Sequence, residues 1–360
     1  MYDIPILMLH TVNDSKDLNP LGVLSVSSKG FESYLKMFQS SGYQMISLSD
    51  LICNDYDQNE KFVVLTFDDG FRDNLYTALP ILKKYNAKAT IFVNPAYFSK
   101  ISDPDEKWGF MSLDEIEEMN RSGVFDIQAH TMTHEFIFTS DKIIDYYTPD
   151  KFEKYYWLAW MLFPDAPNNW NSQAYDYRSK IPFGYPIFEY GRRISSRKFI
   201  PDENYIQYVM KHFGEYKIQS DSNESTHGYY EDNADYENYV KWEIVECKSI
   251  LDNKLNKSVD VLCFPGGGYN DYALNIAKEC GFKCYMRSSS KRVGNNFDHL
   301  RRIQDNTFAG LNRTSFSLIH PGLFPEHFYD YWVAKLSLGA YQNIKRYVFC
   351  KKVLSQFLHG

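Results

Sequence analysis

The feature that most constrains this chain is an alternation of short apolar segments with amphipathic ones. The apolar segments are rich in β-branched and aromatic residues and are bounded by turn or charged residues, as buried strands are. They lie at Ile4–Leu9, Phe62–Phe67, Ala89–Val93, Phe125–Ala129, Val259–Phe264 and Ser315–Ile319. Patterns of helical period lie between them, at Asn74–Tyr85, Leu113–Arg121, Tyr236–Leu255 and Tyr272–Glu279. This alternation predicts an α/β fold with a parallel sheet or barrel, whose functional groups gather at the carboxyl ends of the strands.

One stretch interrupts the alternation. Residues 140–240 contain several prolines and 24 of the 61 Phe, Tyr and Trp residues. Rings in that number can bury enough surface to order the segment. We therefore expect a discontinuous domain of residues 1–138 and 236–325. The aromatic segment, residues 139–235, is expected to form an inserted lid or substrate subdomain, and residues 326–360 a basic helical tail.

Composition excludes several classes of protein. The 360 residues are 44% hydrophobic and have a net charge of −7, so a sizeable core is expected and a nucleic-acid partner is not. No apolar run is long enough to span a bilayer, and the opening segment MYDIPILMLH is too short and too acidic for a signal peptide. We expect a cytoplasmic protein. Its basic, aromatic tail can lie on an anionic membrane surface or pack on the barrel.

Two adjacent carboxylates follow the second expected strand. The segment reads TFDDG, so Asp68 and Asp69 precede a glycine that turns the chain. Neighbouring residues at a strand end point in different directions, so one carboxylate can bind a cation while the other accepts a proton. A solvated Asp-Asp-Gly turn is the simpler alternative for this motif taken alone.

Two histidines follow the strand expected at Phe125–Ala129. In the segment HTMTH, His130 and His134 can hold one metal ion through neutral nitrogens, although alone they can equally be unconnected polar residues. One aspartate and two histidines leave open positions for water and substrate, as in zinc hydrolases and non-haem iron oxygenases. The second aspartate favours a hydrolase, which needs a base to deprotonate water.

Three further places carry candidate groups. The glycine run of FPGGG exposes backbone N–H groups that can stabilise an oxyanion or hold a phosphate, or it only turns the chain. His320 ends the last expected strand and can donate a proton to a leaving group. In the insertion, Arg192 and nearby arginines can grip an anionic group while Tyr185 stacks on a sugar, with a solvated basic face as the alternative.

The order of these motifs, TFDDG, HTMTH, FPGGGYN and LIH, resembles the polysaccharide deacetylases with a NodB homology domain (carbohydrate esterase family 4). The segments PILMLH and LRRI resemble the branch that de-N-acetylates bacterial surface polysaccharides. The resemblance covers residues 4–138 and 236–322. It implies a distorted (β/α)7 barrel, here with a large aromatic insertion. It also implies a hydrolase that removes N-acetyl groups from an amino sugar of a polysaccharide or glycan precursor.

The resemblance also implies roles for single residues. Asp69, His130 and His134 would bind a divalent metal ion, usually zinc. Asp68 would be the general base that takes a proton from the activated water. His320 would be the general acid that protonates the departing amine.

The glycine segment carries the remaining implied roles and the main departures. The backbone N–H of Gly266 would stabilise the oxyanion, and Pro265 and Tyr269 would contact substrate. Cys263 stands where relatives often carry an arginine that partners the catalytic aspartate, and Arg302 is our candidate substitute. The DxxDW-type motif of the family is not recognisable.

Two other functions remain open on sequence grounds. Related barrels hydrolyse amides that are not sugars, and the aromatic insertion favours a sugar because ring faces stack on pyranose C–H surfaces. A non-catalytic relative would only bind carbohydrate, which the presence of all expected ligand and catalytic positions disfavours.

Overall fold

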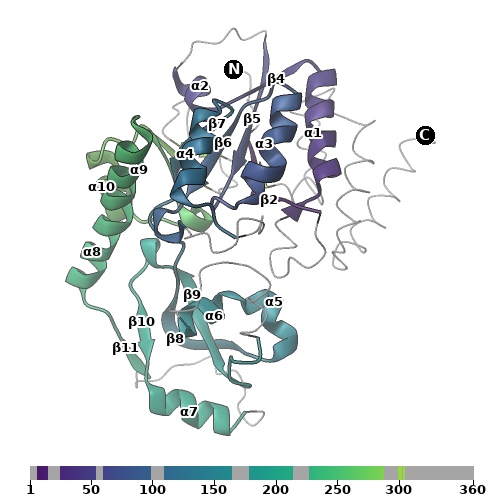
Figure 1. The fold of residues 1–360 in the computed structure, drawn as a ribbon. Helices are drawn as coiled ribbons and strands as arrows, with labels where there is room; N and C mark the ends of the chain where they lie inside the picture. Colours follow the sequence, from purple (N-terminus) through teal and green to yellow (C-terminus); the bar gives the residue numbers. More distant parts are fainter. Residues whose placement is uncertain are drawn as a thin grey trace, which may run out of the picture.

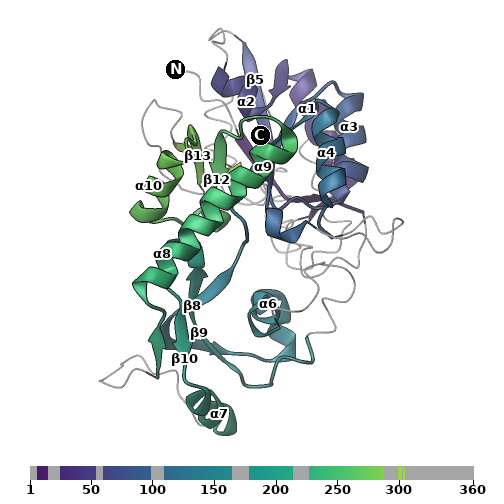
Figure 2. The same ribbon diagram turned by 60° about the vertical axis from the view of Figure 1, so that its left-hand side comes forward.

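The computed structural model describes residues 6–14, 25–53, 60–98, 109–163, 178–213, 227–287, 299–301 and 303–304. Figures 1 and 2 show two parts, a sheet covered by helices and a smaller part that projects below it. The expected strand at Ser315–Ile319 and the expected tail at 326–360 lie outside the described residues.

Within the described residues, the main sheet has nine strands, all paired in parallel. They are β1 (Ile6–Leu9), β4 (Tyr43–Ile46), β5 (Lys61–Phe67), β6 (Ala89–Val93), β7 (Phe125–Ala129), β12 (Val261–Cys263), β13 (Cys284–Arg287), β14 (His299–Arg301) and β15 (Ile303–Gln304). The strand order is β14-β13-β12-β7-β6-β5-β1-β15, and β4 pairs with β5. The two end strands are separated by one residue, and successive Cα atoms lie about 3.8 Å apart. The edges of the sheet therefore meet, which confirms the predicted barrel.

Helices connect these strands and cover the outside of the sheet (Figure 1). They are α1 (Ser28–Ser40), α2 (Leu48–Cys53), α3 (Leu79–Lys84), α4 (Leu113–Arg121), α8 (Asn233–Lys241), α9 (Cys247–Leu255) and α10 (Asp271–Glu279). Short turns of other types are the π-helices η2 (Asn74–Ala78) and η7 (Trp242–Glu246) and the 3-10 helices η3 (Pro95–Tyr97) and η8 (Pro265–Gly267). The strands β2 (Thr11–Val12) and β3 (Ser25–Val26) form a separate parallel pair. Within the residues given above, no helix is long and apolar enough to cross a membrane.

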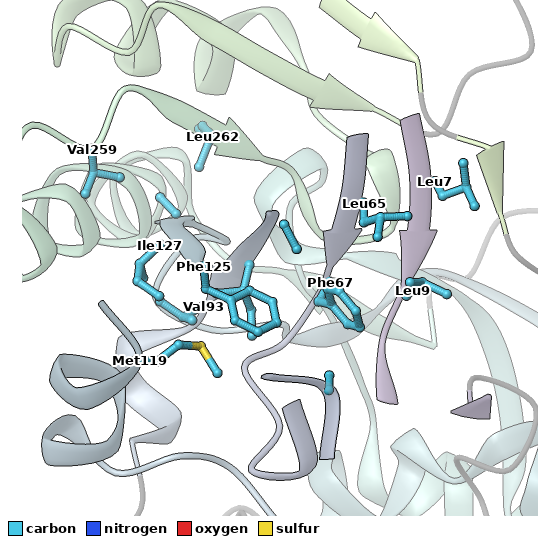
Figure 3. Packing of buried hydrophobic residues seen from close by; sticks show 14 of the residues in the cluster. Leu7, Leu9, Leu65, Phe67, Val93, Met119, Phe125, Ile127, Val259 and Leu262 are labelled. Carbon is cyan, nitrogen blue, oxygen red and sulfur yellow. The ribbon is translucent and has the colours of Figure 1, made fainter. Parts of the chain in front are cut away.

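Alternate residues along each strand pack into different cores, as the two-residue period of a strand requires. One face packs against the helices, and Figure 3 shows part of this core, including Leu7, Leu65, Ile127 and Leu262. The other face forms a smaller core from β1, β4, β5, β6, β12 and β13, with two leucines of α2. Its strand members are Ile6, Ile46, Phe62, Val64, Phe92, Val261, Cys263, Cys284 and Met286. Side chains from so many strands meet because the sheet is curled.

The projecting part has its own apolar core. It contains two antiparallel strand pairs, β8 (Phe136–Tyr146) with β9 (Pro186–Arg192) and β10 (Phe199–Pro201) with β11 (Gly228–Tyr230). Its helices are α5 (Phe152–Tyr155), α6 (Trp157–Leu162) and α7 (Glu203–Lys211). Two 3-10 turns, η4 (Pro149–Lys151) and η6 (Arg193–Ser195), complete it. A hydrophobic cluster of residues 138–209, rich in aromatic rings, lies within it. Strand β8 begins at Phe136, so it crosses the domain boundary that we expected after residue 138.

The buried core of β5 gives the first prediction. Val63 is fully buried, whereas Val245 on η7 is 46% exposed. Val63→Ala should lower the free energy of unfolding by about 2 kcal/mol, because two buried methyl groups are lost and a cavity remains. The matched variant Val245→Ala should change it by less than about 0.5 kcal/mol. Urea denaturation followed by circular dichroism measures both, and equal losses would contradict the described core.

Candidate metal centre

The candidate groups gather at the carboxyl end of the barrel. Asp68 and Asp69 follow β5, Asn94 follows β6, and His130 follows β7. The strand register aligns them, because Phe67 pairs with Ile91 and Val93 with Ala129. The segment that contains Cys263 and Gly266 follows β12, which pairs with β7. Residues that are far apart in sequence therefore meet at one end of the sheet.

Two consecutive left-handed residues turn the chain after β5. The φ angles of Asp69 and Gly70 are +73° and +75°. A Cβ atom on Gly70 would lie 3.1 Å from Cγ1 of Val93, so this close approach to β6 requires glycine. A left-handed aspartate costs about 1 kcal/mol or more of backbone strain. This strained turn directs the Asp69 carboxylate toward His130 and His134.

His130 is held in one tautomer. Its Nδ1 lies 2.8 Å from the carbonyl oxygen of Cys263, which can only accept a hydrogen bond, so Nδ1 carries the proton. The lone pair of Nε2 is then directed toward Asp69. A second-shell carbonyl that fixes the ring of a metal-binding histidine in this way is common.

The three expected ligands face one another. Oδ1 of Asp69 lies 3.4 Å from Nε2 of His130 and 3.9 Å from Nε2 of His134. Ligand atoms bound tetrahedrally to one zinc ion at about 2.0–2.1 Å would lie about 3.3 Å apart. Within the described part of the chain, Asp69 Oδ1 and His130 Nε2 are buried and have no hydrogen-bond partner. The donor set and its spacing therefore fit a divalent cation.

The electrostatics of the centre suit cation binding. Burial alone would raise the pKa of the Asp69 carboxyl, but the nearby rings of His134, His130 and His10 hold it well below its usual range. Burial and the cationic Arg192 lower the pKa of His134. The first effect keeps the Asp69 carboxylate charged and the second keeps the His134 imidazole neutral, which are the forms that bind a metal. At His130 burial is outweighed by the contacts with Cys263 and Asp69, which raise the pKa of the ring, so a metal ion would displace a proton there.

Asp68 occupies a different environment on the other side of the turn. Its N–H donates to the carbonyl oxygen of Leu9 (3.0 Å), and the residue as a whole is 3% exposed. Leu9 pairs with Phe67, so the residues that follow, His10 and Asp68, lie side by side. Nε2 of His10 lies 3.9 Å from Oδ2 of Asp68. Our sequence analysis gave His10 no role, although it follows a strand as the other site residues do.

The loop from His130 to His134 is held by buried polar groups. The amide of Asn94 donates to the carbonyl oxygens of His130, Thr131 and Thr133. The carboxylate of Glu243 accepts from the backbone N–H of Thr133 (2.9 Å) and from its hydroxyl. The Glu243 carbonyl accepts from the N–H of Met132 (3.0 Å).

Glu243 lies on η7, where the expected continuous helix Tyr236–Leu255 contains a π turn. Its side chain is 1% exposed, and burial raises the pKa of its carboxyl although hydrogen bonds from Thr133 and Tyr239 favour the charged form. π turns inside α-helices occur frequently at functional sites. Here the turn presents the carboxylate that fixes the histidine loop.

The other residues that the sequence predicted for the site differ in their positions. Gly266 is exposed with φ +61°, Pro265 is buried, and Tyr269 stacks on Phe264 with ring centroids 4.8 Å apart. Tyr185 is buried in the second apolar cluster, a position that does not support a contact with substrate. The expected general acid His320 and the expected substitute Arg302 both lie outside the described residues.

The substitution of cysteine for the expected arginine has a clear structural setting. Cys263 is fully buried in the smaller core, and its Sγ, a His130 ring nitrogen and an Asp68 oxygen lie within 4.8 Å of one another. A thiol carries no positive charge to offset Asp68. The His10 side chain lies near this carboxylate, with its Nε2 3.9 Å from Oδ2 of Asp68.

Comparisons with known proteins identify one family. Residues 55–154 and 158–285 match the family model described as polysaccharide deacetylase, which is more than half of the chain. "Putative polysaccharide deacetylase YxkH" of Bacillus subtilis is 33% identical over 134 residues, which cover 36% of this chain and 43% of the relative. A poly-β-1,6-N-acetyl-D-glucosamine N-deacetylase of Staphylococcus aureus is 30% identical over 111 residues, covering 30% and 37%. The chain thus spans less than half the length of these curated relatives.

Solved structures share the fold. A de-N-acetylase from Aggregatibacter actinomycetemcomitans superposes with a TM-score of 0.55 at 17% identity, over 87% of this chain and 98% of the other. IcaB from Ammonifex degensii superposes with a TM-score of 0.50 at 16% identity, over 90% and 97%.

The support of the histidine loop gives the second prediction. Glu243→Ala removes the acceptor for Thr133 and should weaken zinc binding about 10- to 100-fold, as the loss of second-shell partners does elsewhere. The control is Glu246→Ala, which removes an exposed carboxylate three residues further along the same helical segment. Zinc titration with a chromophoric chelator measures both. Equal zinc affinities in the two variants would show that Glu243 does not support the loop.

Proposed function

This chain belongs to the polysaccharide deacetylase family, and we propose that it is a metal-dependent hydrolase that removes N-acetyl groups from an amino sugar. The observation that carries the proposal is the meeting of Asp69, His130 and His134, with the second carboxylate of Asp68 beside them. An oxygenase needs no such second carboxylate, whereas amide hydrolysis needs a base for the attacking water.

The residues would divide the chemistry as follows. Asp69, His130 and His134 would hold a divalent cation, with zinc as our first choice, which would polarise the amide carbonyl and acidify a water molecule. Asp68 would accept the proton of the attacking water. Its buried setting keeps bulk water from competing for that proton.

The departing amine needs a proton. The family resemblance assigns this step to His320, and we retain that assignment as a proposal. Nε2 of His10 lies 3.9 Å from Oδ2 of Asp68, and we add His10 as a second proton-transfer group. The amide of Asn74 donates to its carbonyl oxygen (3.0 Å), which fixes the backbone of His10.

The rings around the centre favour a sugar substrate. Tyr97 accepts a hydrogen bond from the N–H of His134 (3.0 Å). Tyr97, Tyr156 and Trp160 are half-buried and pack against one aromatic cluster. Partly exposed rings next to the reacting groups can stack on pyranose faces. The Staphylococcus aureus relatives are named for poly-β-1,6-N-acetyl-D-glucosamine, so we propose an N-acetylglucosamine glycan or its precursor as the first substrate to test. A cytoplasmic location also stays a proposal.

The roles of the two aspartates give the third prediction. Asp68→Asn should retain bound zinc and lose about 10²- to 10⁴-fold in kcat, because it keeps the shape of the side chain but removes the base. Asp69→Ala should lose zinc and activity together. Metal analysis by mass spectrometry and acetate release from chito-oligosaccharides measure the two properties separately. An Asp68→Asn variant with full activity would refute Asp68 as the base.

A substrate panel tests the proposed reaction itself. The wild-type protein should release acetate from N-acetylated oligosaccharides faster than it hydrolyses linear or cyclic amides that carry no sugar. Faster hydrolysis of the simple amides would show that the barrel acts on a non-sugar amide instead. A protein that binds zinc and glycan but hydrolyses neither would be a carbohydrate-binding relative.

A further inference from the structure

Arg192 reaches the centre from the projecting part of the molecule. It is the last residue of β9, and its Nη1 donates to the carbonyl oxygen of His134 (3.1 Å). The guanidinium carbon lies 3.3 Å from the ring centroid of Phe136, so the planar group is stacked on that ring. A hydrogen bond and a stacking contact together hold the cation in one orientation.

The same guanidinium lies against the glycine segment. A Cβ atom on Gly266 would be 3.1 Å from Nε of Arg192 and 3.7 Å from its Nη2. Arg192 therefore lies where a side chain at position 266 would begin, between the metal-site loop and the exposed Gly266.

The neighbouring arginine shows that this arrangement is particular to Arg192. Nη2 of Arg193 lies 2.6 Å from Glu231 and its Nη1 lies 3.3 Å from Glu135. In the described ranges, no carboxylate oxygen lies within 4.0 Å of an Arg192 nitrogen, and its guanidinium donates a hydrogen bond to the carbonyl oxygen of His134. Burial lowers the pKa of Arg192 to about 10, so it stays charged at neutral pH. Arg193 is neutralised by the fold, whereas Arg192 is not.

We propose that Arg192 binds the acyl oxygen of the scissile acetamide, and then the carboxylate of the acetate product, next to Gly266. This inference rests on the proposed function. Asp68 and Asp69 carry two negative charges, which a divalent cation would balance. The charge of Arg192 would then give the centre a net charge of one positive unit. The tetrahedral adduct of amide hydrolysis and acetate each carry one negative charge. A guanidinium can bind a carboxylate through two parallel N–H donors.

The experiment compares zinc-loaded wild-type protein with Arg192→Gln, Arg192→Lys and a charge control, Lys142→Gln. Lys142 lies on β8 of the same hairpin and forms an exposed ion pair with Glu189. Isothermal titration with acetate measures the binding of the product without turnover. Kinetics on chito-oligosaccharides separate kcat from KM, and metal analysis confirms that the variants carry zinc.

The proposal predicts that Arg192→Gln weakens acetate binding about 10-fold or more and lowers kcat about 10²- to 10³-fold with little change in KM. Arg192→Lys should recover part of both losses, and Lys142→Gln should match the wild type. Acetate affinity and kcat of Arg192→Gln within threefold of the wild type would overturn the proposal, as would loss of zinc from this variant, which would make Arg192 a support of the loop. Weaker acetate binding in Arg192→Gln, with no glycan turnover by the wild type, would support the anion site and refute the proposed function instead.

Discussion

The parallel register of the barrel strands is the constraint on which the rest of the structure depends. Because Phe67 pairs with Ile91 and Val93 with Ala129, the residues after these strands end at the same level. The ligand atoms of Asp69 and His130 then need only the local turn at Asp69 to come within 3.4 Å. A shift of one residue in the register of either strand pair would turn each side chain to the opposite face of the sheet and separate the metal-binding groups.

The histidine loop is contacted from two directions outside the barrel strands. Glu243 fixes the histidine loop from the helical side, and Arg192 contacts the same loop from the inserted hairpin. His130 is oriented by the carbonyl oxygen of Cys263 rather than by a side chain. This backbone contact explains how a cysteine can stand at that position without loss of the ring orientation, since any residue supplies a carbonyl there.

Much of this arrangement follows from the sequence, because apolar strands with polar residues at their ends are local patterns. His10 likewise follows an apolar strand, which ends at Leu9, but a single histidine after a strand is too weak a pattern to predict a site residue. The short strands β4 and β13 were not predicted, since four residues are too few to show a clear period. The place of Glu243 could not be predicted, because the helical pattern of residues 236–255 is continuous and gives no sign of a π turn. Arg192 and Tyr185 lie close together in sequence, yet only Arg192 reaches the centre, because long-range packing of the hairpin decides between them.

The central claim is that three side chains bind one metal ion beside a second carboxylate. Anomalous X-ray diffraction at the zinc absorption edge, from crystals of the zinc-loaded protein, tests it most directly. The account predicts one strong anomalous peak within bonding distance of Asp69, His130 and His134, with Asp68 nearby but not bound. A peak elsewhere, or no peak among these three residues in zinc-loaded crystals, would contradict it.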